Sequence, residues 1–289
     1  ANYRQMSLKK IAIVGHGFVG KATEFGFSQN SKIFIVDPKV NTSISEIKDF
    51  SPDFIFVCVP TPMNKSGSQD FSIVQDVFKQ IKSSKVDSCV ILKSTVTPEN
   101  IVKAKNIIPN FIYNPEFLRE SNAREDFINS KMIIIAGEES NQKLVKNLYL
   151  ENSLCETKNF IFTDIETASL IKYTVNSFLA LKVLFFNQVK DIFETNHSQE
   201  NWENFIKYIS YDDRIGNSHM QVPGPDGKKG FGGACFTKDT AAFLDFSSKV
   251  GKEISLLKKA IQINNEIRSN YKNLDQREKD QNVNYDFEK

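Results

Sequence analysis

A glycine pattern near the start of the chain limits the folds that the first half of the sequence can adopt. The pattern Gly-x-Gly-x-x-Gly occupies residues 15–20, directly after the apolar run 11–14. A stretch of helical composition follows, and a second apolar run, 32–36, ends at Asp37, 17 residues after the last glycine. Glycines at this spacing allow a tight strand-to-helix turn, close approach of a pyrophosphate and packing of the helix on the strand. The pattern therefore predicts a dinucleotide-binding βαβ unit.

Within this unit the helix N-terminus is expected to face the phosphates of the ligand. Asp37 can accept hydrogen bonds from the ribose hydroxyls of the adenosine, and its charge would repel a 2′-phosphate, so we expect NAD rather than NADP. A ligand-free tight turn would explain the glycines but not Asp37. The candidate cofactor contacts in the pattern itself are Gly15, Gly17, Phe18, Val19 and Gly20.

Strand-like and helix-like segments keep alternating as far as about residue 155. Further strands are expected at 54–59, 89–92, 111–113 and 132–136, and helices at 71–81 and 141–150. This alternation predicts a Rossmann-like, doubly wound and mostly parallel sheet of the α/β class for residues 6–155. Residues 1–5 precede Met6 and are left out of the fold prediction.

Polar residues follow three of the expected strands. Thr61 follows the third strand, Ser94 and Thr95 follow the fourth, and the segment 114–120 follows the fifth. Open α/β sheets bind ligands at the carboxyl ends of their strands. Taken alone, the segment 114–120 is best interpreted as a solvated turn, but its position in a nucleotide-binding domain favours a functional role.

From about residue 156 the pattern changes to one of helices. A stretch at 165–193 contains neither Gly nor Pro, and Lys172 and Asn176 lie one turn apart on one of its faces. Taken alone, Lys172 would be a solvent-facing lysine. Further helices are expected at 202–209, 240–250 and 254–268. We predict an all-helical domain at 156–273 and a disordered, charged tail at 274–289.

The segment 231–239 combines two adjacent glycines, a cysteine and a Lys-Asp pair. Cys235 is expected just before, or in the first turn of, a helix, whose N-terminus favours negative charge and so lowers the pKa of a thiol. Asp239 lies four residues further on and can orient the thiol, a water or a lysine. A glycine-rich loop that ends in a buried, inert cysteine fits this segment equally well.

Composition excludes several other functions. The net charge of +2 gives no electrostatic argument for binding nucleic acid or an acidic membrane surface. We also expect no membrane-spanning stretch and see no signal peptide. The four cysteines are far apart, which argues against a zinc site or any other metal site, and packed, reduced thiols at Cys58 and Cys89 fit a cytoplasmic location.

The order of these motifs resembles that of the UDP-glucose/GDP-mannose dehydrogenase family. The segments that carry the resemblance are 15–20, 59–62, 93–96, 114–120, 172–176, 213–216 and 231–239. The resemblance extends over nearly the whole chain, and the last three segments together are the most specific.

The resemblance implies an NAD-dependent nucleotide-sugar 6-dehydrogenase that oxidises UDP-glucose to UDP-glucuronate, as in polysaccharide biosynthesis. Cys235 would be the nucleophile, forming a thiohemiacetal and then a thioester. Lys172 and Asn176 would stabilise the oxyanion at the reacting carbon. Glu116 would handle protons and water during hydrolysis, and Asp239 would act as a base or orient the water.

The resemblance also implies binding residues and a homodimer. Additional cofactor contacts would be Thr61, Ser94, Thr95 and Glu120. Substrate contacts would be Glu116, Phe117, Leu118, Arg119, Lys172, Asn176, Arg214, His219 and Gly232. Arg214 is expected to reach a substrate, in its own or a partner subunit's site, although a bare arginine there would be a surface ion pair.

The sequence departs from the family pattern in two places. Thr237 stands where the family usually has proline, which an early helical position tolerates. Family members also continue into a second α/β domain that binds the UDP moiety, and we see no such domain in these residues. The open alternatives are a short active form, a separate chain that supplies the domain, and a non-catalytic NAD-binding module. Another nucleotide sugar, a UDP-N-acetylhexosamine or GDP-mannose, is the alternative substrate.

Overall fold

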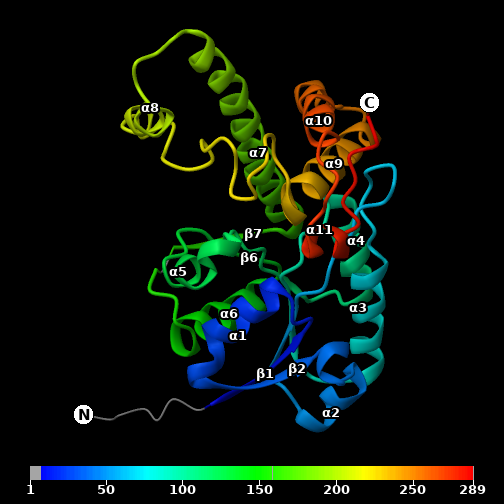
Figure 1. Cartoon of the computed structure of the whole chain (residues 1–289). Helices are drawn as coiled ribbons and strands as arrows, with labels where there is room; N and C mark the ends of the chain where they lie inside the picture. The colour runs from blue at the N-terminus through cyan, green and yellow to red at the C-terminus, as the bar shows by residue number, and fades with distance from the viewer. Residues whose placement is uncertain (1–7, 158, 289) are drawn as a thin grey trace, which may run out of the picture. The chain divides into compact units, whose positions relative to one another are not determined.

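The computed structural model describes residues 8–157 and 159–288, so residues 1–5 lie outside the described part of the chain. The described chain forms two compact units, one built from residues 8–61 and 71–172 and the other from residues 62–70 and 173–288 (Figure 1). The division between these compact units falls after Lys172, within helix α7 (Ile165–Thr195). The domain boundary near residue 155 stays a prediction.

The first unit is built on a seven-stranded sheet with the order β2-β1-β3-β4-β5-β6-β7. Its strands are β1 (Lys9–Val14), β2 (Ser31–Val36), β3 (Phe54–Val57), β4 (Cys89–Leu92), β5 (Ile112–Tyr113), β6 (Ile133–Ala136) and β7 (Phe160–Thr163). Neighbouring strands pair in parallel except β5 and β6, which are antiparallel. The predicted doubly wound, mostly parallel sheet is therefore confirmed.

The seventh strand, β7, was not expected from the sequence. It pairs in parallel with β6 from Ile133↔Phe160 to Ala136↔Thr163. The first turns of α7 then pack Ile165 and Ala168 into the same hydrophobic cluster as the sheet. These contacts explain why the first unit extends to Lys172.

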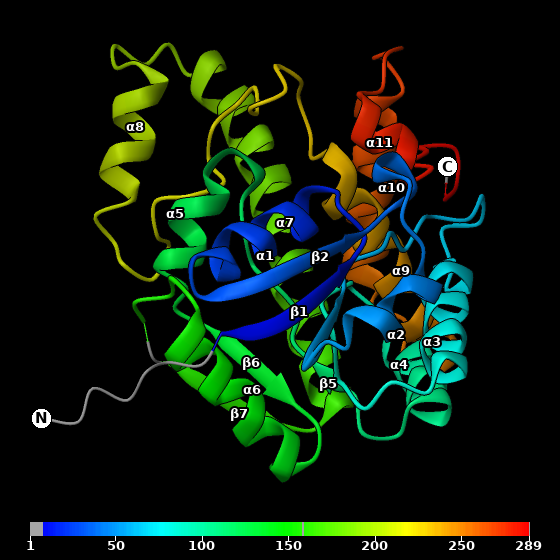
Figure 2. The ribbon, with the colours of Figure 1, turned by 90° about the horizontal axis from the view of Figure 1, so that it is seen from below.

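Helices cover both faces of this sheet (Figure 2). They are α1 (Phe18–Phe27), α2 (Ile47–Phe50), α3 (Ser72–Ser84), α4 (Pro98–Ile107), α5 (Ala123–Ile128) and α6 (Glu139–Asn152), with short 3-10 turns η1 (Ser28–Asn30), η2 (Pro38–Val40), η3 (Ile44–Glu46) and η4 (Glu120–Asn122). Alternate residues of β1 enter different clusters: Ala12 packs with α3 and α4, whereas Ile13 packs with α1, α5 and α6. Because both faces are covered, the central strands are apolar throughout rather than alternating.

The second unit is helical, as predicted. It contains residues 173–195 of α7 together with α8 (Trp202–Ile209), α9 (Gly233–Lys249), α10 (Ser255–Arg268) and α11 (Gln276–Asp280). Ala180 and Leu184 of α7 pack with Ala260 of α10. Trp202 is buried with Phe186 in a second cluster.

The C-terminal segment differs from the disordered tail that we expected. Residues 275–280 form a capped helix in which Asp275 and Glu278 make a reciprocal capping box. Glu278 and Val283 are buried, and the backbone oxygen of Gln281 accepts a hydrogen bond from the Met63 N–H at 2.9 Å. The charged composition of the segment wrongly predicts disorder. The buried Glu278 carboxylate accepts hydrogen bonds from the Asp275 N–H and the Tyr285 hydroxyl, so its partners lie within the segment itself.

Helix α7 also corrects an expectation. By length and composition alone it could cross a membrane, whereas we expected no such stretch. Core helices pass the same test, and α7 buries Ala168, Tyr173 and Ala180 among the described residues. Its composition therefore reflects packing inside the protein as well as exposed apolar side chains such as Phe178 and Phe185.

Candidate functional site

The glycine loop of the first unit is tight at its ends and open in its middle. Gly15 has a φ of +96°, and a Cβ added to it would lie 2.5 Å from the backbone oxygen of Cys58, just beyond β3. A Cβ on Gly20 would overlap the backbone oxygen of Gly15. A Cβ on Gly17 would meet no described atom within 4 Å. The fold thus explains Gly15 and Gly20, and Gly17 leaves room for a ligand to approach the backbone.

This loop lies where the order of the strands reverses. The strand β1 pairs with β2 on one side and with β3 on the other, and the loop follows β1 directly. Such a switch point is where open α/β sheets bind ligands. Helix α1 begins at Phe18 with Gly17 as its N-cap, so no N-cap side chain covers the first turn. The N–H groups of this turn can therefore bind the phosphates of NAD.

Asp37 lies at the end of β2 and is tied to the glycine loop. Its Oδ2 accepts a hydrogen bond from the His16 N–H at 2.8 Å, and its Oδ1 accepts one from the Lys39 N–H at 2.8 Å. A carboxylate has about four acceptor sites, so Asp37 can still accept from ribose hydroxyls. The described residues therefore fit NAD.

The ends of β3 and β4 carry the other expected cofactor residues. Thr61, Ser94 and Thr95 are all buried, and the Ser94 hydroxyl donates to the backbone oxygen of Val59 at 2.6 Å. This bond joins the segments that follow the two strands. The structure therefore brings these residues to the sheet edge that also carries the glycine loop.

Lys93, just before these residues, is a buried cation to which we assigned no role from the sequence. Its Nζ donates to Asn114 Oδ1 at 2.9 Å, and the Tyr149 hydroxyl donates to the same oxygen at 2.7 Å. Burial lowers the pKa of Lys93 to about 8 and raises the pKa of Tyr149. A lysine directly after an apolar strand was the only signal for this arrangement.

Glu116 and Lys172, two of the expected catalytic residues, come together in the first unit. The Lys172 ammonium lies 3.7 Å from Glu116 Oε1 and also donates to the backbone oxygen of Glu116. It lies 4.8 Å from the centre of the Phe117 ring as well. The other oxygen of Glu116 accepts from the Leu118 N–H at 2.6 Å. Lys172 is therefore a buried, paired cation and not a solvent-facing lysine.

The remaining expected catalytic residues gather in the second unit. Asn176 Nδ2 donates to Asp239 Oδ2 at 2.8 Å, and Lys238 Nζ donates to Asp239 Oδ1 at 2.7 Å. All three side chains are buried. Cys235 is the third residue of α9, one turn before Asp239, and is partly exposed. The predicted place of Cys235 in the first turn of a helix is confirmed.

Helix α7 is continuous across the division of the chain. It carries Lys172 at the end of the first unit and Asn176 one turn further along, in the second. Two of the other cysteines behave as expected for packed thiols, because burial raises the pKa of both Cys58 and Cys89 to about 12.

Two expected site residues lie just before α5. Arg119 makes an ion pair with Asp126, with 2.8 Å between Nη2 and Oδ1 and 3.0 Å between Nε and Oδ2. Glu120 begins the turn η4 and is exposed. A substrate role for Arg119 and a cofactor role for Glu120 stay predictions.

Arg214 and His219 belong to the loop that precedes Cys235 in the second unit. Arg214 is 89% exposed and pairs with Asp212 at 2.7 Å, which is the surface ion pair that we weighed against a substrate contact. The ring of His219 lies 5.6 Å from the ring of Phe236, the residue after Cys235. His219 is therefore near the cysteine segment, whereas the contact between Arg214 and Asp212 gives no support to the expected role of Arg214.

An NAD-binding α/β domain is defined by three features: the reversal of strand order, the glycine loop and Asp37. The helices that follow include α9, which carries Cys235 in its first turn. Residues 39–152 match the NAD binding domain of the UDP-glucose/GDP-mannose dehydrogenase family, and residues 166–266 match its central domain. The chain belongs to this family.

Curated relatives agree with this assignment. A UDP-glucose 6-dehydrogenase from Campylobacter jejuni is 30% identical over 297 residues, covering 91% of this chain and 73% of that protein. A UDP-glucose 6-dehydrogenase from Rickettsia felis is 34% identical over 224 residues, covering 75% of this chain and 48% of its relative. The chain thus spans about half the length of the Rickettsia relatives that it matches.

Solved structures support the fold. A UDP-glucose dehydrogenase from Pyrobaculum islandicum superposes with a TM-score of 0.77 at 24% identity, covering 92% of this chain and 70% of that chain. A 3-hydroxyisobutyrate dehydrogenase from Mycobacterium tuberculosis superposes with a TM-score of 0.72 at 15% identity, covering 93% and 96%.

Proposed function

We propose that the chain oxidises the primary alcohol of a nucleotide sugar to a carboxylate with NAD, and that the sugar is UDP-glucose. The observation that carries the proposal is the arrangement in the second unit, where the partly exposed Cys235 precedes the buried Asp239–Asn176 pair by one turn. A simple alcohol dehydrogenase needs no such thiol. The names of the relatives support UDP-glucose as the substrate.

The first step removes a hydride from the alcohol carbon, and the alcohol oxygen passes its proton to water, which leaves an aldehyde. NAD, when bound, supplies the hydride acceptor. The oxygen gains negative charge as its proton leaves, and Lys172 and Asn176 would stabilise that charge. Lys172 is suited to this role because it is buried and held in place by Glu116.

The second step uses the thiol. The Cys235 thiolate adds to the aldehyde carbon, and the resulting thiohemiacetal becomes a thioester by losing a second hydride, for which a second NAD would be the acceptor. Water then attacks the thioester carbon, the carbon–sulfur bond breaks, and the acid and the thiol are released. Glu116 and Asp239 would accept the proton of this water. The short hydrogen bonds of Asp239 with Asn176 and Lys238 support its role in orienting groups near Cys235.

We also expect the enzyme to act as a homodimer in the cytoplasm. The exposed apolar side chains Phe178, Phe185 and Ile192 on α7 support self-association. Light scattering of the purified chain tests this expectation, because a monomer at micromolar concentration would contradict it. A second measurement tests whether a separate chain supplies the contacts to UDP. It compares the affinity of the purified chain for UDP-glucose with its affinity for glucose 1-phosphate. Equal affinities would mean that this chain alone does not bind the UDP moiety.

Product analysis tests the proposed substrate. The purified chain is incubated with NAD and, separately, with UDP-glucose, UDP-N-acetylglucosamine and GDP-mannose, and the products are identified by mass spectrometry. We expect UDP-glucuronate from wild type and none from Cys235→Ala. Turnover of an N-acetyl sugar or of GDP-mannose alone would refute UDP-glucose as the substrate, and undiminished acid formation by Cys235→Ala would refute the thioester route.

A further inference from the structure

The loop that leads to Cys235 is held by side chains of two other helices. The Gly230 N–H donates to Asn187 Oδ1 of α7 at 2.8 Å. The Phe231 N–H donates to Asn264 Oδ1 of α10 at 2.8 Å, and Asn264 Nδ2 donates back to the Phe231 oxygen at 2.8 Å. Arg268 Nη2 donates to the Gly230 oxygen at 3.0 Å. Each peptide group of Gly230 and Phe231 is therefore bonded to a buried side chain.

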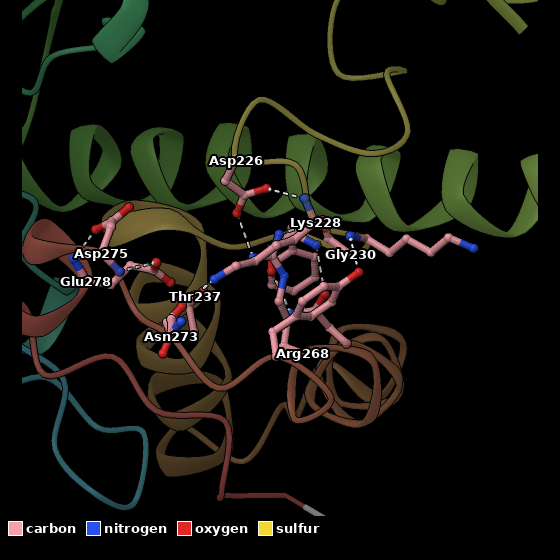
Figure 3. Close-up of polar contacts among 12 residues, drawn as sticks. Asp226, Lys228, Gly230, Thr237, Arg268, Asn273, Asp275 and Glu278 are labelled. Atoms are coloured by element: carbon pink, nitrogen blue, oxygen red, sulfur yellow. Dashed lines mark hydrogen bonds and ion pairs between the residues drawn. The ribbon is translucent and has the colours of Figure 1, made fainter.

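Arg268 links this loop to the segment before it. Its Nη1 lies 2.6 Å from Asp226 Oδ2, and Figure 3 shows its side chain among Asp226, Lys228 and Gly230. The guanidinium also packs directly against Gly232, because a Cβ on that glycine would overlap Nη1 and Cζ. We expected Gly232 to contact substrate, and the approach of Arg268 is the reason that the structure gives for a glycine at this position.

The arrangement is not one that stability alone would favour. Arg268 is 3% exposed, and its Nε is buried with no hydrogen-bond partner in the described part of the chain. An unpaired buried N–H costs free energy, and buried ion pairs are often no more stabilising than apolar side chains of similar size. A role in placing the loop explains why a guanidinium is present here.

The held loop determines where α9 begins. Gly232 is the N-cap of α9, and Cys235 is its third residue. The hydrogen bond between Asn176 and Asp239 fixes the same helix one turn later. Because both attachments lie within the second unit, the first turn of α9 has little freedom to shift. Such restraint matters for catalysis, because a shift of about 1 Å in a reacting group can lower the rate about 100-fold.

We propose that Asn264 and Arg268 are positioning residues for Cys235, which they hold through the backbone of residues 230–232. This inference rests on the proposed function of Cys235 as the nucleophile. The two residues are one turn apart on α10 and touch the loop from the same side of that helix. They should affect the steps that involve the thiol and leave NAD binding, which belongs to the first unit, unchanged.

The main variant is Arg268→Lys, which keeps the charge but cannot bond Asp226 and Gly230 through one planar group. The matched control is Lys272→Arg, a charge-conserving change at an exposed position four residues further on. Asp226→Asn is a milder second variant. It removes the negative charge that pairs with Arg268 and leaves Arg268 itself in place, and Asp226 is partly exposed. It covers the case in which Arg268→Lys does not fold.

Two readouts are needed. The first is kcat and the KM for NAD with UDP-glucose as substrate. The second is the rate of Cys235 alkylation by iodoacetamide from pH 6 to 9, followed by mass spectrometry of its peptide, which requires no substrate. We expect kcat to fall at least about tenfold in Arg268→Lys and less in Asp226→Asn, with an altered alkylation profile and an unchanged KM for NAD.

The outcomes separate this inference from the proposed function. A lower melting temperature with unchanged kcat and an unchanged alkylation profile would show that Arg268 is only structural and would overturn the inference. If Cys235→Ala still forms acid, the proposed function fails, and the alkylation profile of Arg268→Lys still shows whether Arg268 positions the thiol. If Lys272→Arg changes alkylation as much as Arg268→Lys, the effect is not specific to the loop and the inference fails.

Discussion

The buried cation Lys93 provides a quantitative prediction about stability. Its ammonium is enclosed in the first unit, where its hydrogen bonds to Asn114 and Tyr149 only partly replace water. Burial lowers the pKa of Lys93 from its ordinary value of 10.5 to about 8. The perturbation that tests this is Lys93→Met, which keeps an unbranched side chain and removes the charge.

The sign follows from proton binding. Between pH 8 and 10.5 the unfolded chain keeps a proton on Lys93 that the folded chain has released, so the free energy of unfolding rises with pH in this window. Below pH 8 both states are protonated and the full cost of burying the charge is present. The interval of about 2.5 pH units, at about 1.4 kcal/mol each, corresponds to about 3.5 kcal/mol. About 3 kcal/mol of this is regained by pH 10.5, where half of the unfolded chains have also lost the proton.

The free energy of unfolding of Lys93→Met, minus that of wild type, should therefore be largest below pH 8. It should decrease by about 3 kcal/mol by pH 10.5. The buried thiols of Cys58 and Cys89, whose pKa values are raised to about 12, are present in both proteins and largely cancel in this difference.

Urea unfolding from pH 7 to 10.5 provides the measurement. Far-UV circular dichroism is the suitable probe, because the single tryptophan, Trp202, lies in the second unit. Lys103→Met, at an exposed position of α4, controls for the loss of a lysine as such. A difference that stays flat, or that grows with pH, would refute the reasoning about Lys93.

Three further predictions follow from single contacts. Gly17→Ala should leave the melting temperature unchanged but weaken NAD binding at least about tenfold by calorimetry, whereas Gly20→Ala should reduce both; equal melting temperatures for the two variants would contradict this. Asp239→Asn should destabilise the second unit by on the order of 3 kcal/mol, read from Trp202 fluorescence in urea, and a loss below about 1 kcal/mol would show that its buried contacts matter little. Val283→Ala should cost about 1.5 kcal/mol in the same assay, and no loss would mean that the C-terminal segment does not pack in solution.

Much of the fold could be predicted because its signals are local. The glycine loop, the apolar strands and the long helix each carry their pattern within one segment, so the sheet class, the start of α9 near Cys235 and the extent of α7 follow from the sequence. The strand β7 was missed because its four residues are partly exposed and give no clear period.

The supporting contacts of the site could not be predicted in the same way. Glu116 and Lys172 are 56 residues apart, and Phe231 and Asn264 are 33 apart, so their pairing depends on the tertiary fold. Nothing near Arg268 in the sequence shows that its guanidinium lies against Gly232. Family resemblance predicted the reactive residues, and the structure was needed to find the side chains that contact them.

The central claim is that Cys235 carries the substrate through a four-electron oxidation. The most direct measurement is the number of NADH molecules formed per UDP-glucose consumed, with wild type and Cys235→Ala compared side by side. The account predicts about two NADH per sugar for wild type and no acid product from the variant. One NADH per sugar with an aldehyde product, the same acid yield from both proteins, or NAD binding without turnover would contradict it.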